Sequence, residues 1–296
     1  MLNRGVATTL FRVCSARATS LQGFTKIMTL RIVSLNVWGG LLHEPLMRYL
    51  VDIDADVLCL QEVVRTPGAE ADWLVYRDHG VELPQRANLF EEIKAALPSH
   101  DAFFCPVARG ELFDGDRRFA SEFGLATFVR RTYPVIGQAL GFVHGEFSAD
   151  GWGPHPRSRN AHCIRLFDYE RGYPITIAHM HGLRDVAGKG DTSARRHQAD
   201  ALVEIIRQVR HGDERLVVCG DFNVLPGSIT FEILGSLGLV DLITSRGHDD
   251  TRTSHYRKQP RFADYMLVTP DIEVINFDPV AEPEVSDHRA LLLDLR

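Results

Sequence analysis

The sequence contains no hydrophobic run long enough to cross a membrane. Its uninterrupted apolar stretches all fall well short of the roughly 20 residues that a bilayer-spanning helix requires. The N-terminus also lacks the apolar segment of a secretory signal. We therefore expect an intracellular protein, with the cytoplasm as its simplest location.

Cysteine is scarce and is not arranged for cross-linking. The five cysteines are odd in number, and no two of them have Cys-x-x-Cys spacing. This pattern argues against a structural zinc site and against a disulfide framework. Because Cys59, Cys163 and Cys219 lie inside apolar runs, we expect them to be buried as small hydrophobic side chains.

An excess of positive charge is also missing. Lys and Arg number 33 against 39 Asp and Glu, so the formal net charge is −6. This balance argues against broad, non-specific attraction to polyanions such as DNA, although it leaves room for a local basic groove. The hydrophobic fraction of 45% is ample for a core.

Acidic residues are absent from the first 43 positions, where Arg, Ser and Thr are frequent. Such a start resembles a mitochondrial transit peptide; the alternative is that translation begins at Met28 and that the preceding segment is upstream sequence. In either case we expect residues 1–27 to be disordered and residues 28–296 to form one domain. No internal repeat and no linker rich in Pro, Gly or Ser divides that domain.

Strand-like apolar runs alternate with helical patterns along this domain. Helices are predicted at residues 44–52, 87–97, 192–209 and 228–237. Apolar residues recur at helical spacing in the third of these. Thr192 and Ser228 are suitable N-caps for the third and fourth helices.

The apolar run at residues 216–219 ends in Gly220, Asp221, Phe222 and Asn223. Side chains two apart on a strand point to the same face, so Asp221 and Asn223 would project together where the strand leaves the core. A carboxylate there can act as a base or hold a metal, and an amide can stabilise a developing negative charge. A polar strand end that makes an Asx-turn is the structural alternative.

Similar strand ends recur along the chain, which favours a shared site over isolated turns. The polar residues that lie at or near the ends of the other apolar runs are Asn36, Glu62, His179, His181, Asp264, Asp287 and His288. Loops and strand ends held by a rigid sheet are where functional groups collect.

In their order and identity, these motifs resemble the endonuclease/exonuclease/phosphatase superfamily, which includes DNase I. The resemblance spans residues 36–288. It implies an α/β (α+β) four-layer sandwich, in which two packed, mainly antiparallel β-sheets are flanked by helices. It also places the active site at one end of that sandwich.

The resemblance further implies a divalent metal, Mg²⁺ or alternatively Mn²⁺. Carboxylate oxygens suit these ions, which need only one or two protein carboxylates. Glu62 matches the metal-binding glutamate of the family. Asn36 and Asp287 match residues that complete or buffer the metal site.

The catalytic roles also follow from the resemblance. Asp221 matches the aspartate that orients and deprotonates the attacking water, and Asn223 matches the amide that contacts the phosphate. His288 matches a histidine beside the scissile phosphate, where its protonated form would offset charge. Asp264 matches the carboxylate that bonds this histidine and raises its pKa.

The histidine strand and two further segments leave alternatives open. His179 and His181 share one face of a strand, and we prefer His181 as the catalytic one because it precedes Gly182. The basic and aromatic segments 109–123 and 144–160 could clamp a phosphate and stack a ring, or could be solvated loops. Together with His179, the candidates for substrate binding are Trp152, Arg157, Arg159 and Asn160.

We therefore predict a metal-dependent phosphoesterase that hydrolyses a phosphodiester by water attack, with nucleic acid among the candidate substrates. The alternative is a phosphatase or phosphodiesterase for a small or lipid-derived phosphoester, which the acidic balance favours. A catalytically inactive binding module would be expected to have lost its key residues, whereas Glu62, Asp221 and His288 are all present. No specific protein partner is indicated.

Overall fold

The structure is a computed structural model that describes Met1 and residues 29–296. The predictions for residues 1–27 and for a start at Met28 fall, apart from Met1, outside the described residues. Among the described residues, no helix combines the length and the hydrophobicity that crossing a bilayer would take.

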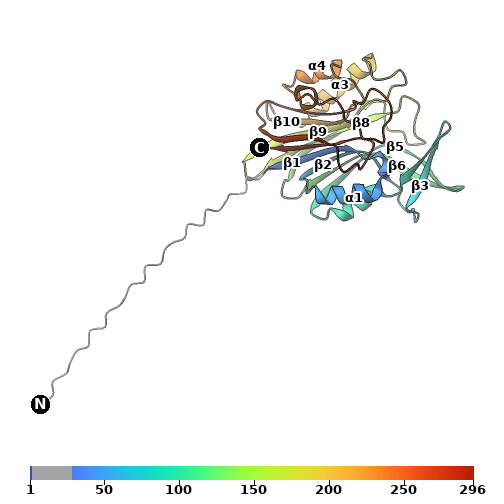
Figure 1. The fold of residues 1–296 in the computed structure, drawn as a ribbon, viewed down its shortest axis with the longest axis horizontal. Coiled ribbons are helices and arrows are strands. Elements are labelled where there is room, and N and C mark those ends of the chain that lie inside the picture. Colours follow the sequence, from blue (N-terminus) through green and yellow to red (C-terminus); the bar gives the residue numbers. More distant parts are fainter. Residues whose placement is uncertain (2–28) are drawn as a thin grey trace.

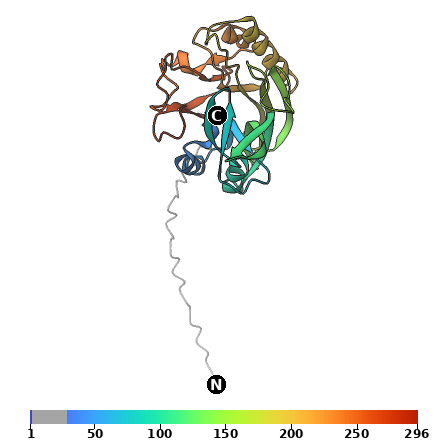
Figure 2. The same cartoon turned by 90° about the vertical axis from the view of Figure 1, so that its right-hand side faces the viewer.

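Two β-sheets pack face to face and carry helices on their outer sides (Figures 1 and 2). In spatial order, the first sheet contains β13 (Val274–Val280), β14 (Ala290–Leu295), β1 (Leu30–Asn36), β2 (Val57–Arg65), β6 (Arg117–Arg130), β5 (His100–Asp114), β3 (Trp73–Asp78) and β4 (Val81–Arg86). The second contains β11 (Val240–Asp241), β12 (Asp264–Val268), β10 (Arg215–Asp221), β9 (Tyr173–His181), β8 (Arg159–Asp168) and β7 (Val135–His144).

Most neighbouring strands in both sheets run antiparallel. In the described part of the chain, parallel pairing joins β1 to β2 and β9 to β10. Each of these parallel pairs lies at the centre of its sheet, where both faces are covered. The predicted four-layer sandwich of two mainly antiparallel sheets is therefore confirmed.

All four predicted helices are present. They are α1 (His43–Asp52), α2 (Leu89–Ala96), α3 (Ser193–Arg207) and α4 (Ile229–Gly235), with a short α5 (Leu242–Ser245) and a 3-10 turn η1 (Trp38–Gly40) in addition. The predicted caps also form, because Thr192 accepts a hydrogen bond from the backbone of Arg195 and Ser228 accepts one from Thr230. Figure 1 shows α1 on the outer side of the first sheet and α3 and α4 on the outer side of the second.

The alternation of side chains along the strands explains the layers. In β1, Leu30 and Ile32 face the second sheet, whereas Val33 and Leu35 face α1 and α2. A strand that is covered on both faces is expected to be rich in apolar residues, and four of the seven residues of β1 are Leu, Ile or Val. The three cysteines that we expected in the core, and Cys105, are free and buried.

The segment 109–123 belongs to a long hairpin, not to a solvated loop. β5 and β6 pair continuously from His100↔Arg130 to Asp114↔Arg117, with one bulge near Pro106. The evidence in the sequence for these two strands was only weak, because outward-facing Arg, Glu and Asp alternate with the residues that pack inward. The hairpin extends the first sheet beyond its packed core and, with β3 and β4, builds one wall of the pocket described below.

We expect Gly220→Ala to lower the free energy of unfolding by roughly 2–5 kcal/mol. Gly220 has a φ of 135°, and a Cβ atom there would lie 2.1 Å from the carbonyl oxygen of Met180 on β9. Urea unfolding followed by circular dichroism measures the effect. Gly235→Ala, where a Cβ atom meets nothing within 4 Å, is the matched control and should be neutral or stabilising. An unchanged urea midpoint for Gly220→Ala would contradict the close approach to Met180 as the reason for a glycine at this position.

Candidate active site

The polar strand ends of both sheets meet at one end of the sandwich. Parallel pairing places Asp221 of β10 level with His181 of β9, and antiparallel pairing places it level with Asp264 of β12. From the first sheet and its loops come Asn36, Glu62, Asp287 and His288. Residues more than 250 positions apart in the sequence thus share one site through strand register.

The Asp221 carboxylate lies at the centre of this group. Its Oδ2 accepts a hydrogen bond of 3.1 Å from Nδ2 of Asn36, and its Oδ1 accepts one of 3.1 Å from the backbone of Asn223. The Nε2 atoms of His181 and His288 lie 3.7 Å and 3.8 Å from Oδ2. With an exposed fraction of only 2%, this carboxylate depends on these neighbours in place of water.

Glu62 enters the site through a β-bulge. The register of β2 against β6 shifts between Leu60 and Val63, and Glu62 takes a φ of 59°. A bulge re-aims one side chain without disturbing the alternation on either side. Oε1 of Glu62 lies 3.8 Å from Nε2 of His181. Burial raises the pKa of Glu62 to about 7, and the negative charges of Asp287 and Asp221 add to the rise.

His288 is held between a carboxylate and a guanidinium. Its Nδ1 lies 2.8 Å from Oδ2 of Asp264, and its Nε2 faces Nη1 of Arg252. Because a guanidinium can only donate, Nε2 accepts, and Nδ1–H donates to Asp264. Burial and the Arg252 charge lower the pKa of His288 to about 4. The expected net rise in the pKa of His288 is not found, because burial and Arg252 outweigh the raising effect of the Asp221 and Asp287 carboxylates.

Arg252 is a site residue that the sequence did not reveal. Its Nη1 donates to Oδ2 of Asp287 at 2.9 Å. Residues 251–253 run beside 287–289 as an extra edge, with an antiparallel bridge between Arg252 and His288. Arg252 lies in a loop between two threonines and not at the end of an apolar run. The local sequence therefore gave no indication of its role.

The oxygen ligands present fit a divalent cation. Oδ1 of Asp287 is buried and has no hydrogen-bond partner among the described residues. The pKa of Glu62 is raised by burial and, to a smaller extent, by the neighbouring carboxylates Asp287 and Asp221. A cation between Glu62 and Asp287 would compensate both groups, and hard oxygen ligands suit Mg²⁺ or Mn²⁺. The Asn36 amide, bonded to Asp221, borders the same space.

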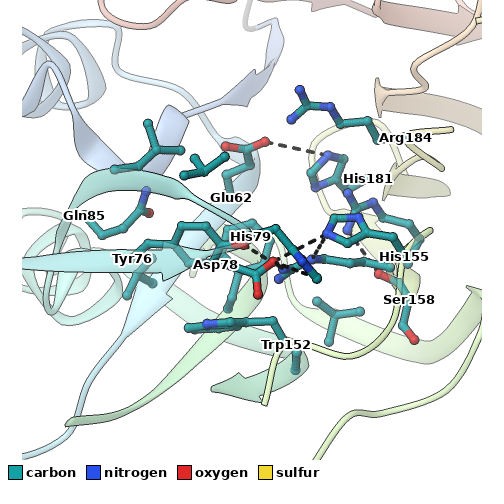
Figure 3. A pocket seen from close by; sticks show the side chains of 18 of the residues that line it. Glu62, Tyr76, Asp78, His79, Gln85, Trp152, His155, Ser158, His181 and Arg184 are labelled. Carbon is teal, nitrogen blue, oxygen red and sulfur yellow. Dashed lines mark hydrogen bonds and ion pairs between the residues drawn. The ribbon is translucent and has the colours of Figure 1, made fainter. Parts of the chain in front are cut away.

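A pocket of about 610 Å³ opens beside Glu62 and His181 (Figure 3). Three of the residues predicted to bind substrate line it, namely Trp152, Arg157 and Arg159. Its other walls come from β3, β4, β5 and β6 and from the loop after β9. The residues that the sequence did not single out here include Tyr76, Asp78, Leu83, Leu112, Phe123 and Val186.

His179 and Asn160 do not reach the pocket. His179 is buried between the sheets, where its Nε2 lies 2.7 Å from the hydroxyl of Thr127. Asn160 donates to the backbone carbonyl of Cys105 at 3.0 Å. The predicted substrate contacts of these two residues are therefore wrong, because both side chains are buried inside the sandwich, where they hydrogen-bond other residues. His181, two positions further along β9, lies beside Glu62 and Asp221.

Solved structures with this fold are numerous at low sequence identity. An endonuclease/exonuclease/phosphatase from Bacteroides vulgatus is 20% identical with a TM-score of 0.63, over 91% of this chain and 99% of that one. The catalytic domain of human nocturnin with a bound sulfate anion is 18% identical with a TM-score of 0.60, over 90% and 93%. A mannosyl-6-phosphatase from Bacteroides thetaiotaomicron is 16% identical with a TM-score of 0.61, over 90% and 99%.

No curated protein sequence matches the chain. The family model described as "Endonuclease/Exonuclease/phosphatase family" matches residues 33–288, which include every polar strand end named above. On this match, the chain belongs to the endonuclease/exonuclease/phosphatase family of metal-dependent phosphoesterases.

Proposed function

We propose that this protein hydrolyses a phosphoester by attack of water, assisted by Mg²⁺ or Mn²⁺. The observation that carries the proposal is the buried Asp221 carboxylate, which lies within 4 Å of both His181 and His288. In the reaction, the oxygen of water bonds to phosphorus while the bond to the leaving oxygen breaks. One proton leaves the water, and one reaches the leaving group.

Glu62 and Asp287 would hold the metal ion, and Asn36 would border it. A bound divalent ion neutralises charge on the phosphoryl oxygens and so lowers the barrier to attack. The partnerless oxygen of Asp287 and the raised pKa of Glu62 support this assignment. The negative charge of Asp287 acts on Glu62 and adds to the rise of its pKa, which a bound cation would offset.

Asp221 is assigned as the group that orients the water and accepts its proton. The amide of Asn36 and the backbone of Asn223 fix both oxygens of the carboxylate. A base that cannot rotate presents its free lone pairs in one direction, which is the requirement for aiming a nucleophile. Asn223 is assigned to the phosphoryl oxygens, because it follows the end of β10 by two residues and its left-handed φ of 54° turns the chain at the site.

The positive charge near the leaving side is assigned to Arg252 and not to His288. The lowered pKa of His288 makes it a neutral hydrogen-bonding group at pH 7, oriented by Asp264. The pKa of His181 is also lowered, by burial and by Arg159, so this histidine is neutral as well. Arg252 and Arg159 then supply the fixed charges that an anionic transition state requires.

A phosphodiester substrate of the nuclease type is the first candidate, and a small or lipid-derived phosphoester is the second. The pocket next to Glu62 favours the second, because it has the size of a small-molecule site. The mannosyl-6-phosphatase among the similar structures supports a small substrate as well. A binding module without activity is disfavoured by the intact set of charged residues.

We expect Asp221→Asn and His288→Ala each to lower the rate of bis(p-nitrophenyl) phosphate hydrolysis by about 10²–10⁴-fold. Asp221→Asn removes the proton acceptor but keeps the shape, and EDTA should abolish the wild-type rate. Asp101→Asn, at an exposed ion pair with Arg131, is the matched control. Full activity in Asp221→Asn would refute the assignment, and no activity in the wild type with any phosphoester would refute the function.

We expect Glu62→Gln to stabilise the metal-free protein at pH 8 by roughly 1–3 kcal/mol while abolishing activity. The pKa of Glu62 is about 7 when folded against an ordinary 4.5. The folded state therefore holds the proton more tightly, so this contribution to stability is full below pH 4.5 and is lost as the pH rises through 7. Unfolding in urea with EDTA at pH 5 and pH 8 measures it.

The difference between Glu62→Gln and the wild type should shrink to a small remainder at pH 5 and vanish below pH 4.5, where the glutamate is protonated in both states. Added Mg²⁺ should raise the stability of the wild type at pH 8 and should leave Glu62→Gln unchanged, since binding to the folded state stabilises it. A variant that is less stable than the wild type at pH 8 without metal would contradict the account of the two carboxylates.

A further inference from the structure

The pocket beside the candidate active site is continuous with it. Glu62 and His181 form one end of the 610 Å³ space, and Figure 3 shows their side chains together at that end. Sites for small molecules enclose about 300–1,000 Å³. A group attached to a phosphate at Glu62 and His181 would therefore extend into this pocket, which makes its lining the determinant of substrate choice.

The walls of the pocket are mainly apolar and aromatic. The rings of Trp152 and Tyr76 lie 5.6 Å apart, centre to centre. Trp152 lies against the backbone of β5, where a Cβ atom on Gly110 would come within 2.3 Å of the indole. Phe123 flanks His181 at a ring separation of 6.5 Å. The aromatic side chains thus line the space between the mouth and the catalytic end.

The charged groups in the middle of the pocket are already paired with one another. Arg157 donates from Nη2 to the hydroxyl of Tyr76 at 2.6 Å and forms an ion pair with Asp78. His155 lies 3.5 Å from the same carboxylate. Because these polar groups satisfy one another, they leave little hydrogen-bonding capacity for a ligand. Recognition in this part of the pocket depends on shape and apolar contact.

Two arginines, Arg159 and Arg184, line the catalytic end of the pocket. Arg159 is buried, and its Nε and Nη1 donate to the carbonyls of Gly182 and Ser158. Its charge still faces Glu62 and Asp221, and burial lowers its pKa to about 10. Figure 3 shows Arg184 next to His181. An anionic group is therefore favoured at this end of the pocket and not along its length.

The mouth of the pocket is rimmed by exposed aliphatic side chains. Val81 and Leu83 on β4 are 47% and 41% exposed, and Val186 in the loop after β9 is 87% exposed. Single exposed aliphatic residues are ordinary on a protein surface. Three that line one pocket form an apolar rim at which a chain can leave without meeting charge.

We propose that the substrate is a small amphiphilic phosphoester whose apolar arm lies in this pocket and whose phosphate lies at Glu62, His181 and Arg159. The inference rests on the proposed function and adds the class of substrate. A polynucleotide carries a phosphate on every unit and would need free cations along its path, whereas Arg157 is already paired.

A series of p-nitrophenyl alkyl phosphates with methyl, butyl and octyl arms tests the proposal, with Mg²⁺ and full-length protein. Each methylene that leaves water should raise kcat/KM by roughly fourfold until the pocket is full. Phenyl and cyclohexyl arms distinguish an aromatic from an aliphatic preference. Thymidine p-nitrophenyl phosphate and a short oligonucleotide represent the nucleic-acid arm.

Leu83→Asp and Trp152→Ala should each reduce the gain in kcat/KM from the butyl to the octyl ester by at least tenfold. Leu140→Asp is the matched control, since Leu140 on β7 is 51% exposed and does not line the pocket. A rate that is independent of arm length, or fastest on the oligonucleotide, would overturn the proposal. Absence of hydrolysis of every ester would instead refute the proposed function.

A second inference comes from a chain of polar side chains buried between the sheets. Thr127 of β6 lies 2.7 Å from Nε2 of His179 and 2.7 Å from Nδ1 of His162. Nδ1 of His179 lies 3.5 Å from the amide nitrogen of Gln61, and Nε2 of His162 lies 3.3 Å from the amide oxygen of Gln138. Burial lowers the pKa of both histidines, so both are neutral.

One arrangement of protons satisfies both histidines and the Thr127 hydroxyl. The Gln61 amide, which also donates to the carbonyl of Cys59, donates to His179, whose Nε2–H donates to the Thr127 hydroxyl. That hydroxyl then donates to His162, whose Nε2–H donates to Gln138. Buried polar groups that are hydrogen-bonded in this way hold their neighbours rigidly. Gln61 is the bulge residue directly before Glu62.

We infer that Thr127 is a positioning residue that holds the bulge of Glu62 through His179 and Gln61. Thr127→Val should raise the Mg²⁺ concentration for half-maximal rate by about 10–100-fold, the range for residues that orient metal ligands, with a smaller change in KM. Thr127→Ser should restore the wild-type value. Thr176→Val, which removes a buried hydroxyl without a partner in the described structure, is the control.

Should Thr127→Val fail to fold, Gln61→Met removes the donor at the other end of the chain and carries the same expectation. An unchanged Mg²⁺ requirement in a folded Thr127→Val or Gln61→Met protein would overturn the inference. An equal shift in Thr176→Val would do so as well, because the effect would then follow from any lost buried hydroxyl.

Discussion

The burial of negative charge at one end of the sandwich is the constraint on which the rest of the site depends. Asp221 is almost fully enclosed, and it is surrounded by two further carboxylates from other strands. Removing an anion from water costs several kcal/mol unless partners replace the lost hydration. The amide of Asn36, two neutral histidines and the guanidinium of Arg252 are those partners, and each comes from a different element.

The two sheets hold these charged groups in the positions that their close packing requires. Strand register brings Asp221, His181 and Asp264 to one level, and the core between the sheets leaves no freedom for a strand to slide, because a slip of one residue would turn every side chain to the other face. The bulge in β2 is a local departure from this regularity, and it brings Glu62 into the site. Regular pairing and this bulge together define the geometry.

The sequence predicted what short contiguous patterns encode. Polar residues that end apolar runs, such as Asn36 and Asp221, can be recognised from the local sequence. The helices and their caps could be recognised in the same way. Arg252 did not, because its role arises from a loop that pairs with residues 287–289 far along the chain. His179 and His181 share one strand face, so periodicity could not separate the buried one from the one at the strand end. The burial of His288, which reverses the expected direction of its pKa shift, is a property of the packed site.

The β3–β4 hairpin lies at the edge of its sheet and is joined to β5 through two residue pairs, Val75↔Phe113 and Tyr76↔Leu112. Both of its strands line the pocket, yet none of the residues that we propose to hold the metal or to transfer a proton is on it. Insertions and substitutions in this hairpin can therefore accumulate over evolutionary time without passing through an inactive intermediate. The site residues are constrained by the chemistry, whereas the β3–β4 hairpin is free to vary. Related chains can therefore be expected to differ most in length and composition at this edge.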